Sequence, residues 1–182
     1  MRIISGTLGG RRINPPAHMP HTRPTTDVAK EALFNIIGNN LDLEGFHALD
    51  LFGGTGSISY ELVSRGVADV VTIEKDPQMQ AFILRTVETL KITNMQVLKQ
   101  DVFRFLQHTN DAFDLIFAGP PYALTTIDQL PDIIHERKLL APGGWFILEH
   151  TPRNNYADRQ DFHAERKYGT TIFSIFIRPE TA

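Results

Sequence analysis

The amino-acid sequence predicts an α/β fold on a mostly parallel sheet that ends in an antiparallel hairpin. Five short apolar runs alternate with amphipathic segments through the middle of the chain. This alternation is typical of parallel strands joined by helices that cover both faces of a sheet. A glycine-rich turn at 53–56 follows the first apolar run. Near the carboxyl end, only Gly169 and Thr170 separate two strand-like runs, which is the spacing of a tight hairpin.

Each expected element follows from its local pattern. Thr25 or Thr26 can cap the first helix, with Asp27 in its first turn. Pro77 suits the first turn of another helix. The expected helices cover 28–37, the segment from the glycine turn to about 65, 77–91, 102–107 and 126–137. The expected strands cover 48–52, 70–74, 96–99, 113–118, 145–149 after a Pro-Gly-Gly turn, 162–168 and 171–177.

Length and composition limit the class of protein. The chain has 182 residues, of which 42% are hydrophobic, so we expect one domain with at most a small appendage. The absence of cysteine excludes disulfides and thiolate metal sites, and the histidines at 47, 108, 135, 150 and 163 show no metal-ligand spacing. The start lacks the apolar run of a signal peptide, and no stretch resembles a membrane span. We therefore expect a cytoplasmic monomer that needs neither metal nor membrane.

The charge distribution suggests a basic N-terminal arm at 1–24, followed by the main domain at 25–182. The net charge is −3, but the first thirty residues contain five basic residues and one acid. They therefore carry +4, and the remainder carries −7. Short extended pieces at 2–4 and 11–13 flank a Gly-Gly turn. A flexible arm of this kind suits contacts with nucleic-acid phosphates, although a solvated tail without function is the alternative.

The turn after the first strand is a candidate cofactor site. Its glycines allow a sharp turn and close approach of a ligand, and the following helix supplies free amides. The turn is not G-x-G-x-x-G, so pyrophosphate fits poorly and a nicotinamide dehydrogenase is the weakest option. S-adenosylmethionine has no phosphate, and its amino-acid end can lie along this turn with Asp50 facing its positive charge. The alternative is an ordinary strand-to-helix turn capped by Asp50. The cofactor residues expected here are Asp50, Phe52, Gly53, Gly54 and Gly56.

Two acids after the next strands extend this site. Glu74 ends the second strand, 21 residues after Gly53, where a carboxylate can hold both ribose hydroxyls. The alternative is the start of a helix capped by Asp76. Asp101 follows the third strand and can accept from an adenine amino group, next to Val102. Its alternative role is the N-cap of the helix that begins at Val102.

The chemical site is expected at the end of the fourth strand, at Gly119, Pro120, Pro121 and Tyr122. Two prolines fix the backbone and remove two amide donors, which leaves carbonyl acceptors, and the tyrosine offers a face on which a base can stack. Methylation of a nucleobase amine needs such groups. Acceptors that draw on its hydrogens make the nitrogen more nucleophilic, and positioning supplies much of the rate. The alternative is a proline-rich loop with a packed tyrosine.

Several motifs together resemble the RsmD-type family of 16S rRNA methyltransferases, which act on the exocyclic amine of guanine. They lie at 2–6, 10–13, 23–35, 50–56 and 168–170, so the resemblance spans nearly the whole chain. It implies a Rossmann-like class I fold with a seven-stranded sheet and S-adenosylmethionine as cofactor. It also implies that the substrate is one guanine of small-subunit rRNA, in an assembled or assembling 30S particle. Together with the charge of the arm, it implies RNA contacts by Arg2, Arg11, Arg12, Arg23 and Thr25.

Gly119 departs from the family motif, which is Asp-Pro-Pro-Tyr. The aspartate of that motif accepts a hydrogen bond from the target amine, which a glycine side chain cannot do, although the Pro120 carbonyl can. Loss of such a bond is worth roughly 1.5–3 kcal/mol, or about a hundredfold in rate. One alternative is therefore a protein that binds cofactor and rRNA but has impaired catalysis. An adenine-specific nucleic-acid methyltransferase is another, although 182 residues leave no separate target-recognition domain.

Overall fold

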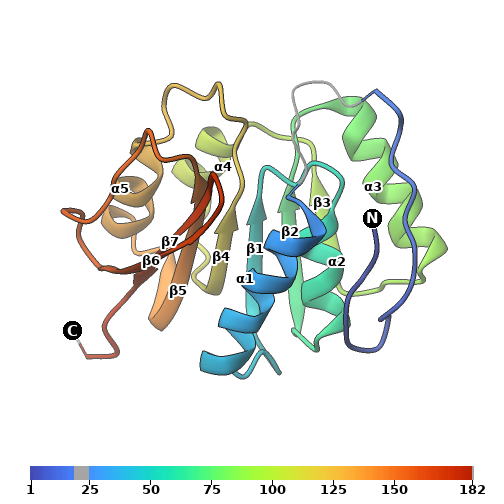
Figure 1. Cartoon of the computed structure of the whole chain (residues 1–182), viewed down its shortest axis with the longest axis horizontal. Coiled ribbons are helices and arrows are strands. Elements are labelled where there is room, and N and C mark those ends of the chain that lie inside the picture. The colour runs from blue at the N-terminus through green and yellow to red at the C-terminus, as the bar shows by residue number, and fades with distance from the viewer. Residues whose placement is uncertain (19–24, 182) are drawn as a thin grey trace.

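The computed structural model describes residues 1–18 and 25–181 and has one seven-stranded sheet in the order β3-β2-β1-β4-β5-β7-β6 (Figure 1). The first five strands along the chain are parallel, β7 runs antiparallel to β5, and β6 runs antiparallel to β7. The predicted α/β fold with a terminal hairpin is thereby confirmed. The strands are β1 (His47–Leu51), β2 (Asp69–Ile73), β3 (Met95–Leu98), β4 (Phe113–Ala118), β5 (Leu140–His150), β6 (Phe162–Tyr168) and β7 (Thr171–Ile177).

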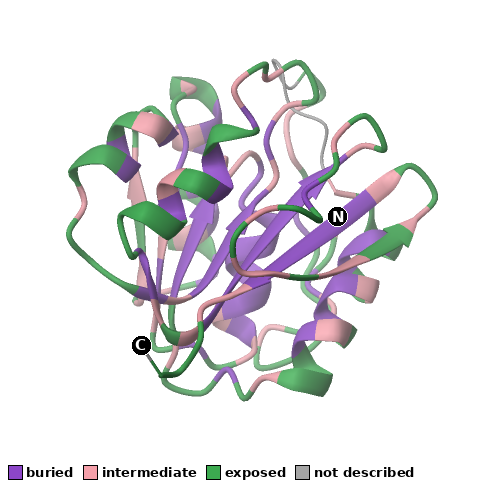
Figure 2. Cartoon of the chain, turned by 90° about the vertical axis from the view of Figure 1, so that its left-hand side faces the viewer, coloured by how far each residue is buried: buried purple, intermediate pink, exposed green. Residues whose placement is uncertain are grey.

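Helices cover both faces of the sheet. Leu33 of α1 and Leu62 of α2 share a core cluster with Ile147 of β5 on one face. Leu106 of α4 and Leu130 of α5 pack in a different cluster on the opposite face. Figure 2 shows the buried strands between the exposed outer surfaces of the helices. The helices are α1 (Asp27–Asn40), α2 (Ser57–Ser64), α3 (Pro77–Thr89), α4 (Val102–His108) and α5 (Gln129–Glu136).

Polar caps fix where three helices begin. The Thr26 hydroxyl accepts from the Ala29 amide at 3.2 Å, and the Asp76 and Asp101 carboxylates cap α3 and α4 in the same way. Pro77 occupies the first turn of α3, as predicted. No helix in the described part of the chain is both long and apolar enough to cross a bilayer.

The fifth strand is longer than predicted. It covers Leu140–His150 rather than 145–149, because the Pro-Gly-Gly segment is part of the strand instead of a turn before it. The register shifts between the pairs Phe113–Leu140 and Leu115–Trp145, which is a bulge. Gly143 permits this bulge because its φ is +77°. The helix predicted at 126–137 is shorter and spans Gln129–Glu136.

The described part of the N-terminal arm is packed against the domain, whereas the sequence predicted a flexible arm. Ile3 and Ile13 are 1% and 6% exposed and join a core cluster with residues of α2 and α3. The Ile3 amide donates to the Arg11 carbonyl at 2.9 Å, and the Gly10 amide donates to the Ile3 carbonyl at 2.8 Å. The expected turn between two extended pieces is therefore present, and apolar burial holds it against the domain.

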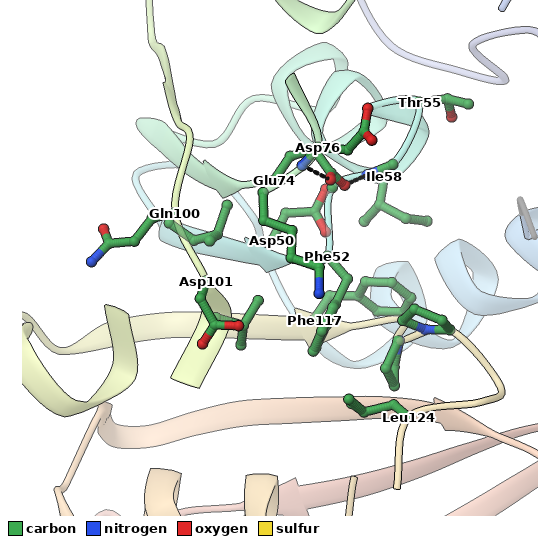
Figure 3. Close-up of a pocket in the computed structure, with 18 of the residues that line it drawn as sticks. Asp50, Phe52, Thr55, Ile58, Glu74, Asp76, Gln100, Asp101, Phe117 and Leu124 are labelled. Atoms are coloured by element: carbon green, nitrogen blue, oxygen red, sulfur yellow. Dashed lines mark hydrogen bonds between the residues drawn. The ribbon is translucent and has the colours of Figure 1, made fainter. Parts of the chain in front are cut away.

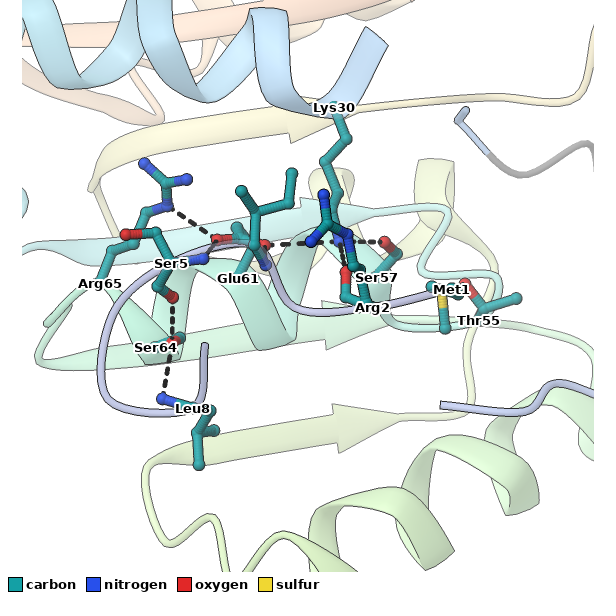
Figure 4. A network of polar contacts seen from close by, with 11 residues as sticks. Met1, Arg2, Ser5, Leu8, Lys30, Thr55, Ser57, Glu61, Ser64 and Arg65 are labelled. Carbon is teal, nitrogen blue, oxygen red and sulfur yellow. Dashed lines mark hydrogen bonds and ion pairs between the residues drawn. The ribbon is translucent and has the colours of Figure 1, made fainter. Parts of the chain in front are cut away.

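A buried carboxylate connects the arm to the domain (Figure 4). Glu61 of α2 accepts from the Ile4 and Ser5 amides at 2.8 and 3.1 Å. Lys30 Nζ lies 3.4 Å from Glu61 and donates to the Arg2 carbonyl at 2.7 Å. Lys30 is one of the five basic residues among the first thirty, but it is only 1% exposed. Its charge therefore does not face an external partner. Burial lowers the pKa of Lys30, although Glu61 opposes this effect.

Candidate active site and cofactor cavity

A cavity of about 450 Å³ opens at the carboxyl ends of the parallel strands, where ligands bind in this architecture (Figure 3). Its wall is formed by the ends of β1, β2 and β4 and by the segments that follow β3 and β4. The residue before the Thr26 cap of α1 also contributes. The predicted site residues that line it are Asp50, Phe52, Gly53, Gly54, Glu74, Asp101, Val102, Gly119, Pro120, Pro121 and Thr25.

The glycine turn fits tightly against the second strand. A Cβ at Gly53 would lie 2.6 Å from Thr72 Cγ2, so only glycine fits without movement of the wall. Phe52 and Gly54 have positive φ angles of 61° and 59°, which turn the chain sharply away from β1. Gly56 does not line the cavity and instead begins α2 with a φ of +83°, where a Cβ would clash with the Tyr60 ring.

Asp50 is a buried acid in the wall. It is 1% exposed and accepts from the Ser59 hydroxyl at 2.6 Å, and Ser59 lies 2.7 Å from the Thr72 hydroxyl. Burial raises the pKa of Asp50 to about 7, against the opposing effect of the Ser59 bond. A cation in the cavity would favour the charged form of this carboxylate.

Glu74 connects the two loops that follow β1 and β2. Its Oε1 accepts from the Gly54 amide and its Oε2 from the Asp76 amide, both at 2.8 Å (Figure 3). Burial raises the pKa of Glu74, although these two amides oppose the change. Each carboxylate oxygen has a second lone pair, so Glu74 can also accept from hydroxyl groups of a ligand.

The charge of the wall selects the kind of ligand. Four acids line the cavity, namely Asp50, Glu74, Asp76 and Asp101, and Lys75 is the one cation in the described lining. This set disfavours a pyrophosphate and favours a cationic ligand that carries hydroxyl groups. Among the described residues, no group of three or more histidine, aspartate or glutamate side chains is arranged to hold a metal ion.

Asp101 and Val102 form another side of the cavity. Asp101 caps α4 by accepting from the Arg104 amide at 3.1 Å, so the structural role considered for it is present. It also lines the cavity, as does the buried Val102. Phe103 and Leu124 add apolar surface that the sequence reasoning missed. These groups suit the flat face and polar edge of an adenine.

The Pro-Pro-Tyr turn lies at the cavity rim. Gly119, Pro120 and Pro121 line the cavity, whereas Tyr122 is not part of its wall and is 41% exposed. A Cβ at Gly119 would lie 3.1 Å from Phe117 Cε1, so a larger side chain there would require Phe117 to shift by a few tenths of an ångström.

The residues expected to contact RNA have different positions. Arg2, Arg11 and Arg12 are exposed on the arm, and Arg23 lies outside the described residues. Thr25 lines the cavity, and its hydroxyl donates to Glu149 Oε1 at 2.6 Å. Glu149 is not predicted as a site residue, because it is separated from Thr25 by 124 positions.

The sheet order and the antiparallel last strands are those of the class I S-adenosylmethionine-dependent methyltransferases, and the acidic cavity lies at the carboxyl edge of the sheet. Residues 1–177 match the family described as "Conserved hypothetical protein 95". The chain therefore belongs to this family, the RsmD-type methyltransferases.

Two curated relatives and two solved structures illustrate the similarity. The "Putative rRNA methyltransferase YlbH" of Bacillus subtilis is 35% identical over 154 residues, 82% of either chain. The "Ribosomal RNA small subunit methyltransferase D" of Buchnera aphidicola (strain Bp) is 30% identical, covering 97% of this chain and 91% of the relative. The solved "Putative methyltransferase yhhF" of Escherichia coli is 25% identical, with a TM-score of 0.85 and 98% coverage of both chains. A 16S rRNA N2 G1207 methyltransferase from T. thermophilus, solved with AdoMet and guanosine, shares the fold at 22% identity, with a TM-score of 0.69 and 85% and 44% coverage.

Proposed function

We propose that this chain transfers a methyl group from S-adenosylmethionine to the exocyclic amine of a specific guanine in small-subunit (16S) rRNA. The proposal rests on the acid-lined cavity, whose wall includes the Gly119-Pro120-Pro121 turn. A cationic cofactor and a nucleobase can meet there. The names of relatives that align over nearly the whole chain support rRNA as the substrate.

The cavity fits this cofactor. Gly53 leaves no room for a Cβ against Thr72, so the main chain itself forms the wall on which an amino-acid moiety can lie. Asp50 would face the cationic end, Glu74 the ribose hydroxyls and Asp101 the adenine amino group. S-adenosylmethionine supplies the methyl group on a positively charged sulfur.

The turn after β4 would orient the target base. The Pro120 carbonyl would accept from the guanine amine, and the Tyr122 ring would stack on the base. The amine nitrogen then presents its lone pair to the methyl carbon. Correct positioning supplies much of the rate, since the amine needs no strong base before attack.

The arm would bind the rRNA backbone. Arg2, Arg11 and Arg12 are exposed on a segment that the Glu61 contacts hold against the domain, so their charges can reach phosphates. We assign residues 1–24 to this arm and 25–182 to the methyltransferase domain. The protein would act as a cytoplasmic monomer on an assembled or assembling 30S particle.

Gly119 supports a second candidate, namely a protein that binds the cofactor and rRNA but catalyses poorly. A Cβ at position 119 would lie 3.1 Å from Phe117 Cε1, so a side chain there needs a small shift of Phe117. An aspartate at 119 would therefore restore an acceptor only if Phe117 moves. An adenine-specific activity has no comparable structural support.

The test compares the wild-type chain with Gly119→Asp on small subunits that lack the methyl group, and on deproteinised 16S rRNA, with radiolabelled cofactor. We expect both proteins to label guanine, with the particle as the better substrate. Labelling by Gly119→Asp alone would identify the second candidate. If neither protein labels rRNA while both bind the cofactor, the substrate assignment is wrong.

A further inference from the structure

Position 119 and Glu149 are neighbours at the carboxyl edge of the sheet. Ala118 of β4 pairs with Leu148 of β5 in parallel register, so the next positions along the two strands are 119 and 149. Neighbouring strands are about 4.8 Å apart. A buried carboxylate, 5% exposed, therefore lies beside the position at which this chain lacks one.

The two positions also share a face of the sheet. Phe117 and Ile147 each lie two residues earlier on their strands and pack in the same core cluster as α1. A Cβ at Gly119 would point at the Phe117 ring, at 3.1 Å, which places the direction of that side chain on the same face. Glu149 follows Ile147 by the same two-residue step along β5.

Thr25 connects this carboxylate to the cavity. Its hydroxyl donates to Glu149 Oε1 at 2.6 Å, and Thr25 lines the cavity together with Gly119 and Pro120. A hydroxyl has one hydrogen and two acceptor lone pairs. Since its hydrogen points to Glu149, the lone pairs of Thr25 are available to a group in the cavity, and the carboxylate makes the oxygen a stronger acceptor.

We propose that the Thr25 hydroxyl, held by Glu149, accepts the hydrogen bond of the target amine in place of a carboxylate at position 119. The inference rests on the proposed function. The amine nitrogen forms its bond to the methyl carbon as the carbon–sulfur bond breaks, and that electron pair stays on sulfur. The extra proton on nitrogen passes to the Thr25 oxygen while the Thr25 proton passes to Glu149. Thr25 is then the catalytic residue and Glu149 the residue that positions it.

The experiment measures kcat, KM for the particle and the dissociation constant for the cofactor in Thr25→Val, Thr25→Ser and Glu149→Gln. Thr25→Val keeps the size of the side chain and removes the hydroxyl. We expect its kcat to fall about ten- to hundredfold, with cofactor binding within about twofold of wild type. Thr25→Ser should recover most of this kcat, and Glu149→Gln should lower kcat without raising KM. The control is Thr93→Val, the same change at an exposed residue outside this cavity's wall, and it should behave as wild type.

Two results would overturn the inference alone. One is a Thr25→Val protein with wild-type kcat. The other is a loss that follows weakened cofactor binding and is not recovered by serine, which would make Thr25 a cofactor contact. A wild-type chain that methylates no guanine overturns the proposed function and this inference together, and it is visible before any variant is compared.

Discussion

The tight contact between Gly53 and Thr72 predicts that alanine at position 53 is harmful and that a smaller residue at position 72 relieves the harm. In Gly53→Ala, the new Cβ would lie 2.6 Å from Thr72 Cγ2, whereas ordinary contacts begin at 3.4 Å. Thr72 is fully buried, and its hydroxyl is 2.7 Å from Ser59, which bonds Asp50. The side chain therefore cannot turn away without breaking that chain of bonds.

The cost of this overlap can be estimated. Overpacking of a buried site costs about 1–3 kcal/mol of stability, and displacement of the glycine turn should weaken cofactor binding at least about tenfold. Thr72→Ser removes the clashing methyl group and keeps the hydroxyl, at a cost of about 1 kcal/mol alone. The double variant Gly53→Ala/Thr72→Ser should thus bind cofactor within about threefold of wild type, and the two changes should be coupled by about 1 kcal/mol or more.

Calorimetric titration with S-adenosylmethionine and urea unfolding measure these quantities. Gly38→Ala is the matched control, because a Cβ there meets nothing within 4 Å and the residue lies inside α1. It should raise stability by about 0.5–1 kcal/mol and leave cofactor binding unchanged. Wild-type cofactor affinity in Gly53→Ala, or no recovery in the double variant, would refute the proposed wall.

Three further predictions concern charged groups. The pKa of Asp50 is about 7 instead of 3.8, so the folded state binds the proton more tightly, and this group's contribution to stability falls from about pH 4 to 7 by at most about 4 kcal/mol. In Asp50→Asn, the free energy of unfolding measured in urea should no longer fall between pH 4 and 7. The rise in cofactor affinity that the wild type shows as the pH passes 7 should also disappear. Unchanged pH profiles of stability and affinity would contradict the role of Asp50. Glu61→Leu should lower the free energy of unfolding by about 3–5 kcal/mol, because it leaves the buried Lys30 without its acid. The control Glu88→Leu, on the exposed side of α3, should lower it by less than about 0.5 kcal/mol. Equal losses in the two variants would show that the arm does not depend on Glu61. Arg11→Glu/Arg12→Glu should weaken rRNA binding and reduce the salt dependence measured by filter binding by about two ions, and an unchanged slope would exclude the arm from the interface.

Local patterns predicted the sheet and about half of the residues that line the cavity. The apolar runs and the Gly169-Thr170 pair define strands and a hairpin that the structure contains. Asp50, Glu74 and Asp101 follow successive parallel strands, whose carboxyl ends meet at one edge, so their shared cavity follows from topology.

Non-local contacts explain what the sequence did not predict. The arm is packed because Glu61, 57 positions after Ile4, bonds its amides. Thr25 lies in the cavity wall and bonds Glu149, 124 positions away, across elements whose relative position no periodicity encodes. The longer fifth strand depends on a bulge between the Phe113–Leu140 and Leu115–Trp145 pairs. A Pro-Gly-Gly segment by itself is typical of a turn.

The most direct test of the central claim is the identity of the methylated nucleoside. Wild-type protein, labelled cofactor and small subunits lacking the methyl group would be incubated, and the rRNA digested to nucleosides for mass spectrometry. We expect N2-methylguanosine at a single position. Methyladenosine as the product, or no methylated nucleoside despite measured cofactor binding, would contradict it.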